Sequence, residues 1–135
     1  MTATTGSAPV LEPTTLGAGA ADPQTELPKP TLAAHWHDCY GHSYVRITAQ
    51  ITADVNTDYA EFRVWTKDGS GIGAPHTLLG GTGKFRATLT TGAPDNDAVS
   101  ETFHIVGAHQ YAVECTDRTD AAVRATVYGT LTSDP

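Results

Sequence analysis

The chain has 135 residues, a formal net charge of −7 and a pI of about 5.1. The length indicates one domain, and the acidic balance argues against a nucleic-acid partner, because phosphate binding needs clustered Lys and Arg. No stretch approaches the roughly 18 apolar residues of a membrane span, so we expect no membrane partner.

The N-terminal segment differs in composition from the rest of the chain. Residues 1–30 contain five of the eight prolines and lack the basic and apolar regions of a secretory signal, so we expect no export by the usual route. The apolar residues of this segment are isolated and follow no period: Val10, Leu11, Leu16 and Leu27. We expect an extended, irregular N-terminal arm over residues 1–31, either a disordered tail or an arm that becomes ordered along a partner.

The densest group of potential metal ligands is HWHDCYGH, residues 35–42. In an extended chain, His35, His37 and Cys39 share one face, and two His at i and i+2 can hold zinc given further ligands. No CxxC or HExxH motif accompanies them, so we expect a structural role, with no metal and no cofactor. Here Trp36 and Tyr40 would pack where the arm enters the domain, and the histidines would hydrogen-bond to loops.

From residue 43 the hydrophobicity alternates with a period of two. This pattern predicts six half-buried strands: 43–55, 59–67, 83–90, 101–106, 110–117 and 123–132. The Gly-, Pro- and Asp-rich segments 67–75 and 91–100 are predicted to be loops. The inward positions that we expect to form the core are Ile47, Ile51, Phe62, Phe85, Phe103 and Val127.

The C-terminal strands resemble those of an immunoglobulin-like domain. ETFHIV, the corner GAHQ, YAVECTD and VRATVYGTLT are similar to its last three strands, with Tyr111 opening the penultimate strand and Cys115 within it. The resemblance implies an all-β, immunoglobulin-like antiparallel β-sandwich over residues 32–135. Cys39 and Cys115 could form one bridge or remain thiols.

No motif supports catalysis. A GxSxG elbow is absent, the glycine-rich GSGIG is not followed by the Lys-Ser/Thr of a phosphate loop, and Cys115 lies on the inward side of its strand. We therefore expect a protein that is not an enzyme.

Outward-facing aromatic residues next to arginine have the composition of a protein interface. Tyr59, Arg63 and Trp65 share the outer side of one predicted strand, and Tyr128 faces outward on the last. A loop or the arm could instead cover them. Together with the apolar residues of the arm, the predicted partner-binding set is Val10, Leu11, Leu16, Leu27, Trp36, Tyr59, Arg63, Trp65 and Tyr128.

An arm, TATTGSAPVLEPTTLGAGAADPQTELPKPT, joined to a small acidic β domain is similar to auxiliary virion proteins of tailed bacteriophages, particularly capsid decoration (cement) proteins. The resemblance implies a virion protein, assembled in the host cytoplasm, that binds the major capsid protein as trimers and stabilises the shell. Three alternatives are a tail or baseplate component, a carbohydrate- or receptor-binding module that uses Trp36, Tyr59 and Trp65, and a small zinc enzyme built on HWHDCYGH.

Overall fold

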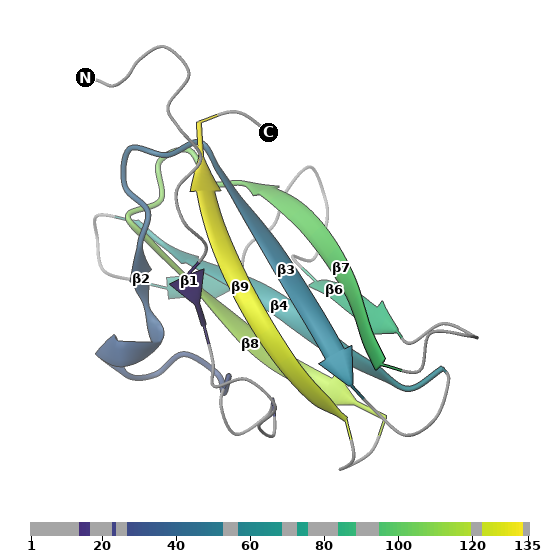
Figure 1. Cartoon of the computed structure of the whole chain (residues 1–135). Coiled ribbons are helices and arrows are strands. Elements are labelled where there is room, and N and C mark those ends of the chain that lie inside the picture. Colours follow the sequence, from purple (N-terminus) through teal and green to yellow (C-terminus); the bar gives the residue numbers. More distant parts are fainter. Residues whose placement is uncertain are drawn as a thin grey trace.

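The computed structural model describes residues 14–16, 23, 27–52, 57–68, 73–75, 84–88, 95–119 and 123–133. These residues form two antiparallel β-sheets packed face to face (Figure 1). The elements are β1 (Thr14–Thr15), the 3₁₀ turn η1 (Ala33–His35), β2 (His37–Asp38), β3 (Tyr44–Thr52), β4 (Tyr59–Lys67), β5 (Gly73–Pro75), β6 (Lys84–Thr88), β7 (Asp95–His104), β8 (Gln110–Arg118) and β9 (Arg124–Thr132).

The first sheet has the strand order β1-β9-β3-β7, and the second has β2-β8-β4, with both β5 and β6 paired to the free side of β4. Figure 1 shows β9, β3 and β7 in the front layer and β8 and β4 behind them. Most connections cross from one sheet to the other, since β1, β3, β7 and β9 alternate with strands of the second sheet. This winding is that of a jelly roll, one of the arrangements by which two antiparallel sheets enclose a core.

The predicted β-sandwich is therefore confirmed. Its strand order differs from that of immunoglobulin domains, where the last two strands are neighbours in one sheet, because β8 and β9 lie in different sheets here. Alternating hydrophobicity could not decide between the two orders. The alternation shows which side of a strand is buried, and it contains no information on the sheet to which the strand belongs.

The predicted strand 59–67 has the observed bounds of β4, and the other long strands agree within a few residues where the structure describes them. The loop predictions are wrong for residues 73–75, which form β5, and for residues 95–100, which form the first part of β7. Residues 95–100 pair with residues 48–52 of β3, and this pairing outweighs the low strand propensity of Asp and Asn. Strands β1, β2 and β5 span two or three residues each, too few to show a period.

The core lies between the two sheets. All six predicted core positions are buried: Ile47, Ile51, Phe62, Phe85, Phe103 and Val127. The ring of Phe85 lies 5.5 Å from that of Phe62 and 6.0 Å from that of Phe103, so the three rings join β4, β6 and β7 across the sandwich.

Two parts of the predicted arm pack onto the sandwich. Strand β1 pairs with β9, and the Leu16 backbone N–H donates to the Val127 carbonyl at 2.8 Å. The Leu27 carbonyl accepts from the Cys115 N–H at 2.8 Å, and both leucine side chains are buried in the core. Leu16 and Leu27 were expected to be anchors for a partner, but they fill the chain's own core. Val10 and Leu11 lie outside the described residues.

Candidate functional site

The structure distributes HWHDCYGH over a turn, a short strand and a loop. The Nδ1 atom of His35, the last residue of η1, accepts hydrogen bonds of 3.1 Å from the backbone N–H groups of Thr31 and Leu32. The predicted contact between a histidine and a loop is confirmed at this residue. His37 opens β2 opposite Tyr111, with ring centroids 5.5 Å apart, and burial lowers its pKa although Asp38 opposes the shift.

Cys39 follows β2 and is fully buried. Its backbone N–H donates to the His109 carbonyl at 3.0 Å, and its thiol lies 3.7 Å from the Ala108 carbonyl oxygen. Burial raises the pKa of the Cys39 thiol to about 11, so the thiol stays protonated near neutral pH and is a poor nucleophile or metal ligand. Tyr40 does not pack at the arm entry as expected, because it is 71% exposed and contacts the His109 ring.

Neither a bridge nor a metal cluster is present in the described part of the chain. Cys39 and Cys115 are both buried and do not form a disulfide with each other. Within the described ranges, three or more His, Cys, Asp or Glu side chains nowhere gather closely enough to hold a metal ion. Among these same residues, no helix is long and apolar enough to cross a membrane.

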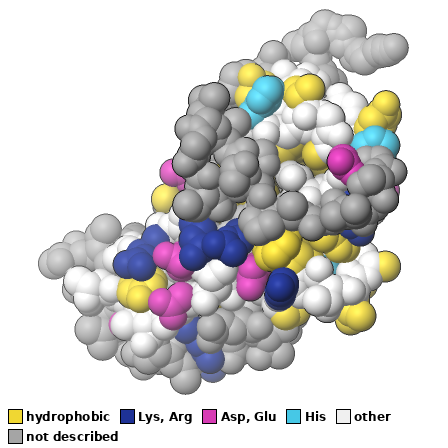
Figure 2. All heavy atoms as spheres, turned by 180° about the vertical axis from the view of Figure 1, so that it is seen from behind, with side chains coloured by type: hydrophobic (Ala, Val, Ile, Leu, Met, Phe, Trp, Pro, Cys, Tyr) yellow, Lys and Arg dark blue, Asp and Glu magenta, His cyan; other side chains and the backbone are white. Residues whose placement is uncertain are grey.

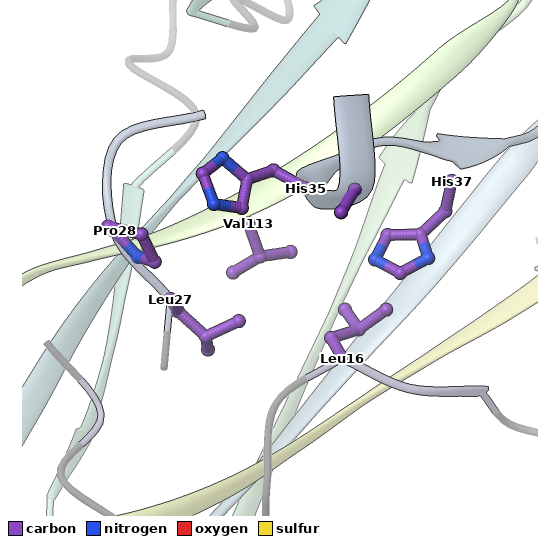
Figure 3. Close-up of a pocket in the computed structure, with 7 residues that line it drawn as sticks. Leu16, Leu27, Pro28, His35, His37 and Val113 are labelled. Carbon is purple, nitrogen blue, oxygen red and sulfur yellow. The ribbon is translucent and has the colours of Figure 1, made fainter. Parts of the chain in front are cut away.

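A small cavity lies where residues 27–35 pass alongside the sandwich near β1 and β2 (Figure 3). Its volume is about 80 Å³, and its lining comprises Leu16, Leu27, Pro28, Ala34, His35, His37 and Val113. Figure 3 shows the two imidazole rings on one side and the leucine side chains on the other. Pockets for drug-sized ligands are several times larger, roughly 300–1,000 Å³, so this cavity can accept water but not a sugar or nucleotide.

The outer side of the second sheet has a different character. On β4, Ala60, Phe62 and Val64 are buried, whereas the alternate residues are only partly covered. The predicted outward direction of Tyr59, Glu61, Arg63, Trp65 and Lys67 is thereby confirmed.

The strand register brings the two tryptophans of the chain together. Trp65 lies opposite Ala112 of β8, and Tyr111 lies opposite His37 of β2. If the pairing between β2 and β8 is continued by one residue, Trp36 lies opposite Ala112. Ala112 then has Trp65 on one side and Trp36 on the other. Ala112 faces outward but is only 1% exposed, as expected for an alanine between two indoles.

Each aromatic ring on this side of the sheet has a cation next to it. The Lys67 ammonium lies 4.3 Å from the Trp36 ring centroid, and the Lys29 ammonium lies 5.6 Å from that of Trp65. The Arg86 guanidinium lies 3.8 Å from the ring of Tyr59. Cation–π attraction of this kind holds long basic side chains over the aromatic rings.

The carboxylates hold several of these side chains in place. Glu114 accepts a hydrogen bond of 2.9 Å from the Trp65 indole, and Asp117 accepts one of 3.1 Å from the Tyr59 hydroxyl. That hydrogen bond raises the pKa of Tyr59.

Glu61 binds the two cations of β6, Lys84 at 3.6 Å and Arg86 at 3.4 Å. Burial would raise the pKa of Glu61, but the Thr116 hydroxyl and the two cations lower it overall. Glu61 is therefore ionised at neutral pH, and its charge is balanced locally.

We call this surface the cation–aromatic face. It is made of Trp36, Tyr59, Trp65, Ala112, the cations Lys29, Arg63, Lys67, Lys84 and Arg86, and the carboxylates Asp38, Glu61, Glu114 and Asp117. Five of the eight Lys and Arg of the chain against four carboxylates give it a net charge of +1, although the chain carries −7 and the rest of the sequence therefore −8. Figure 2 shows the blue and magenta side chains interleaved in a band across this side of the molecule.

The predicted partner-binding residues are thus only partly brought together. Trp36, Tyr59, Arg63 and Trp65 share the cation–aromatic face, whereas Tyr128 lies on β9 of the other sheet. The prediction from the sequence missed Lys29 and the cations of β6. The outward parity of Lys84 and Arg86 was visible in the sequence, but their pairing with Glu61 depends on the β4–β6 register.

No protein-family model and no curated protein matches the chain. Among solved structures, the chain is similar to the SPBc2 prophage-derived protein YomS, with a TM-score of 0.50 and 17% identity over 98% of this chain and 100% of that one. Eiger TNF from S. frugiperda gives a TM-score of 0.39 and 15% identity over 87% and 84% of the two chains. The globular domain of zebrafish complement 1qA gives 0.35 and 8% over 89% and 90%. At such identities, the likeness to YomS shows a shared fold.

Proposed function

We propose that the chain is a non-enzymatic structural protein of a phage virion, more specifically a capsid decoration protein that binds the major capsid protein and stabilises the shell. The observation that carries this proposal is the fold shared with a prophage-derived protein over 98% of this chain and 100% of that one. Jelly rolls are frequent among viral capsid domains, which supports the same assignment by architecture.

The structure offers a physical basis for such a role. A rigid sandwich presents the cation–aromatic face to a partner, and the chain enters the first sheet at its edge through β1. On the particle, three copies would assemble around symmetry positions of the shell. Many weakly bound copies can reinforce a shell, because the shell stays held by the remaining copies when any one copy dissociates.

A second candidate is a carbohydrate- or receptor-binding module. The observation in its favour is that Trp36 and Trp65 share one sheet face, since exposed indoles provide stacking surfaces for sugar rings. This candidate predicts that the isolated protein binds a neutral oligosaccharide.

The deciding experiment uses gradient-purified particles of the phage that encodes the chain. Heads and tails are separated, and the protein is quantified in each fraction by mass spectrometry. A decoration protein is found with the heads in a copy number comparable to that of the capsid protein, and heads from a gene deletion release DNA at a lower temperature. Recovery with the tails would identify a tail component, and absence from particles would refute the virion assignment.

A further inference from the structure

We propose that the cation–aromatic face binds an acidic segment of a partner protein, with Arg63 and Lys67 pairing with its carboxylates and Trp36 and Trp65 covering its apolar side chains. The inference rests on the proposed function only in taking the partner to be a virion protein. The chemistry of recognition is argued from the face itself.

Several cations of the face form no salt bridge with a carboxylate of the described residues. Glu61 forms ion pairs with both Lys84 and Arg86 and offsets one of their two charges. Among the described residues, in contrast, no salt bridge involves Lys29, Arg63 or Lys67. These unpaired cations lie next to the two indoles and leave positive charge for an incoming anion.

Arg63 gives the most specific indication. Its Nε is buried, and no described residue accepts a hydrogen bond from it. Buried N–H groups are nearly always paired in folded proteins, because an unpaired one has lost its hydration without replacement. Arg63 as a whole is only partly covered, so a carboxylate can approach its guanidinium and supply acceptors in the geometry that arginine favours.

The cations also discriminate between classes of ligand. The Lys67 and Lys29 ammonium groups already lie over the rings of Trp36 and Trp65. A neutral sugar that stacks on these rings would have to displace them, whereas a carboxylate can pair with the ammonium groups in place. The indole edges remain for apolar side chains of the segment, and Trp and Arg are enriched at the centres of protein interfaces.

The distribution of charge limits the size of the anion. The face has a net charge of +1, whereas the rest of the sequence carries −8. A long polyanion such as a nucleic acid would extend beyond the face and be repelled, but a short acidic segment would not. Attraction of the segment to the face falls as salt rises, because these charges are partly exposed.

The two tryptophans of the chain both lie on this face, so intrinsic tryptophan fluorescence reports on it alone. The full-length protein is titrated with a capped six-residue peptide of alternating glutamate and leucine. A peptide of alternating glutamine and leucine and the neutral sugar cellohexaose are the comparison ligands. We expect a saturable change in emission with the glutamate peptide alone, and weaker binding at about 0.3 M than at about 0.05 M salt.

Charge-removing variants test the residues. Arg63→Gln and Lys67→Gln are each expected to weaken binding of the glutamate peptide about three- to tenfold, which corresponds to the loss of one partly exposed charge contact. Arg46→Gln removes the same charge from an exposed position on β3 of the other sheet and should leave the affinity unchanged. Circular dichroism melts confirm that each variant is folded.

Three outcomes would overturn the inference: a response to cellohexaose without one to the glutamate peptide, equal binding of the glutamate and glutamine peptides, or an equal effect of Arg46→Gln and Arg63→Gln. Particle binding separates its failure from that of the proposed function. If Arg63→Gln and Lys67→Gln proteins decorate particles as well as the unmodified protein, the inference fails while the virion assignment stands. If the unmodified protein binds the peptide but is absent from particles, the virion assignment fails while the proposed binding of an acidic segment stands.

Discussion

The Tyr111 hydroxyl, on β8, crosses the core and occupies the position where a side chain on Gly129 of β9 would begin. The two residues belong to different sheets, and both are buried. A glycine inside a strand is normally unfavourable, and close approach of another group is a common reason for one. This contact therefore explains why β9 carries a glycine in its interior. It also brings the two sheets together at this point.

Gly129→Ala should destabilise the protein by about 1–3 kcal/mol, because the added methyl group overlaps the Tyr111 ring and hydroxyl. Denaturant unfolding measures the change. In the double variant with Tyr111→Phe, loss of the hydroxyl should make the combined effect smaller than the sum of the two single effects. Additive effects, or a change below about 0.5 kcal/mol for Gly129→Ala, would show that the two groups do not meet.

Phe103→Ala should lower the free energy of unfolding by about 3–5 kcal/mol, because Phe103 packs against Phe85 between the sheets and its removal leaves a cavity. Val106→Ala is the control, since Val106 follows the same strand but is 64% exposed. Its effect should be within about 0.5 kcal/mol. Equal effects of the two substitutions would mean that the inward assignment of Phe103 is incorrect.

The alternation of apolar residues was sufficient to place β4 and the burial of Phe62, because a half-buried strand needs a period of two. It was not sufficient to bring Trp36 next to Trp65. Their proximity depends on β2, a two-residue strand whose register with β8 no local pattern specifies. The position of Lys29 on the cation–aromatic face was equally unpredictable, because Lys29 belongs to a segment without periodicity. This segment is held by the backbone hydrogen bond from Cys115 to Leu27.

The stability of the protein should fall as the pH is lowered below about 6.5 because of His37. Burial lowers its pKa from 6.5, so between that value and the lower folded-state pKa the unfolded chain binds more protons. The stability contributed by neutral His37 is complete above 6.5 and is lost as the pH falls towards the folded-state pKa.

Urea unfolding at several pH values between about 5 and 7.5 should show a shallower dependence for His37→Gln than for the unmodified protein. The reference is the unmodified protein at a pH well above 6.5, because His37 is then neutral in both the folded and the unfolded state. The same slope for both proteins would contradict the role of His37.

Removal of metal ions should leave the melting temperature unchanged. HWHDCYGH has its histidines in a turn, a strand and a loop, and the Cys39 thiol is buried and protonated. Melting curves with and without EDTA should coincide. A large fall in the melting temperature with EDTA, together with near-stoichiometric zinc in the purified protein, would instead support a metal site.

The last prediction concerns Leu16 and Leu27, which both line the small cavity and belong to the core. Leu16→Ala and Leu27→Ala should each destabilise the protein by about 2–4 kcal/mol, since each enlarges a cavity that already measures about 80 Å³. Deletion of residues 1–30 should lower the melting temperature further, because it also removes β1 and the hydrogen bond from Cys115 to Leu27. Deletion of residues 1–13 is the matched control. The shortened protein retains every one of these contacts, so its melting temperature should equal that of the full-length protein. Equal melting temperatures for all three proteins would mean that the N-terminal segment adds nothing to the core, and its leucines would again be candidates for contact with a partner.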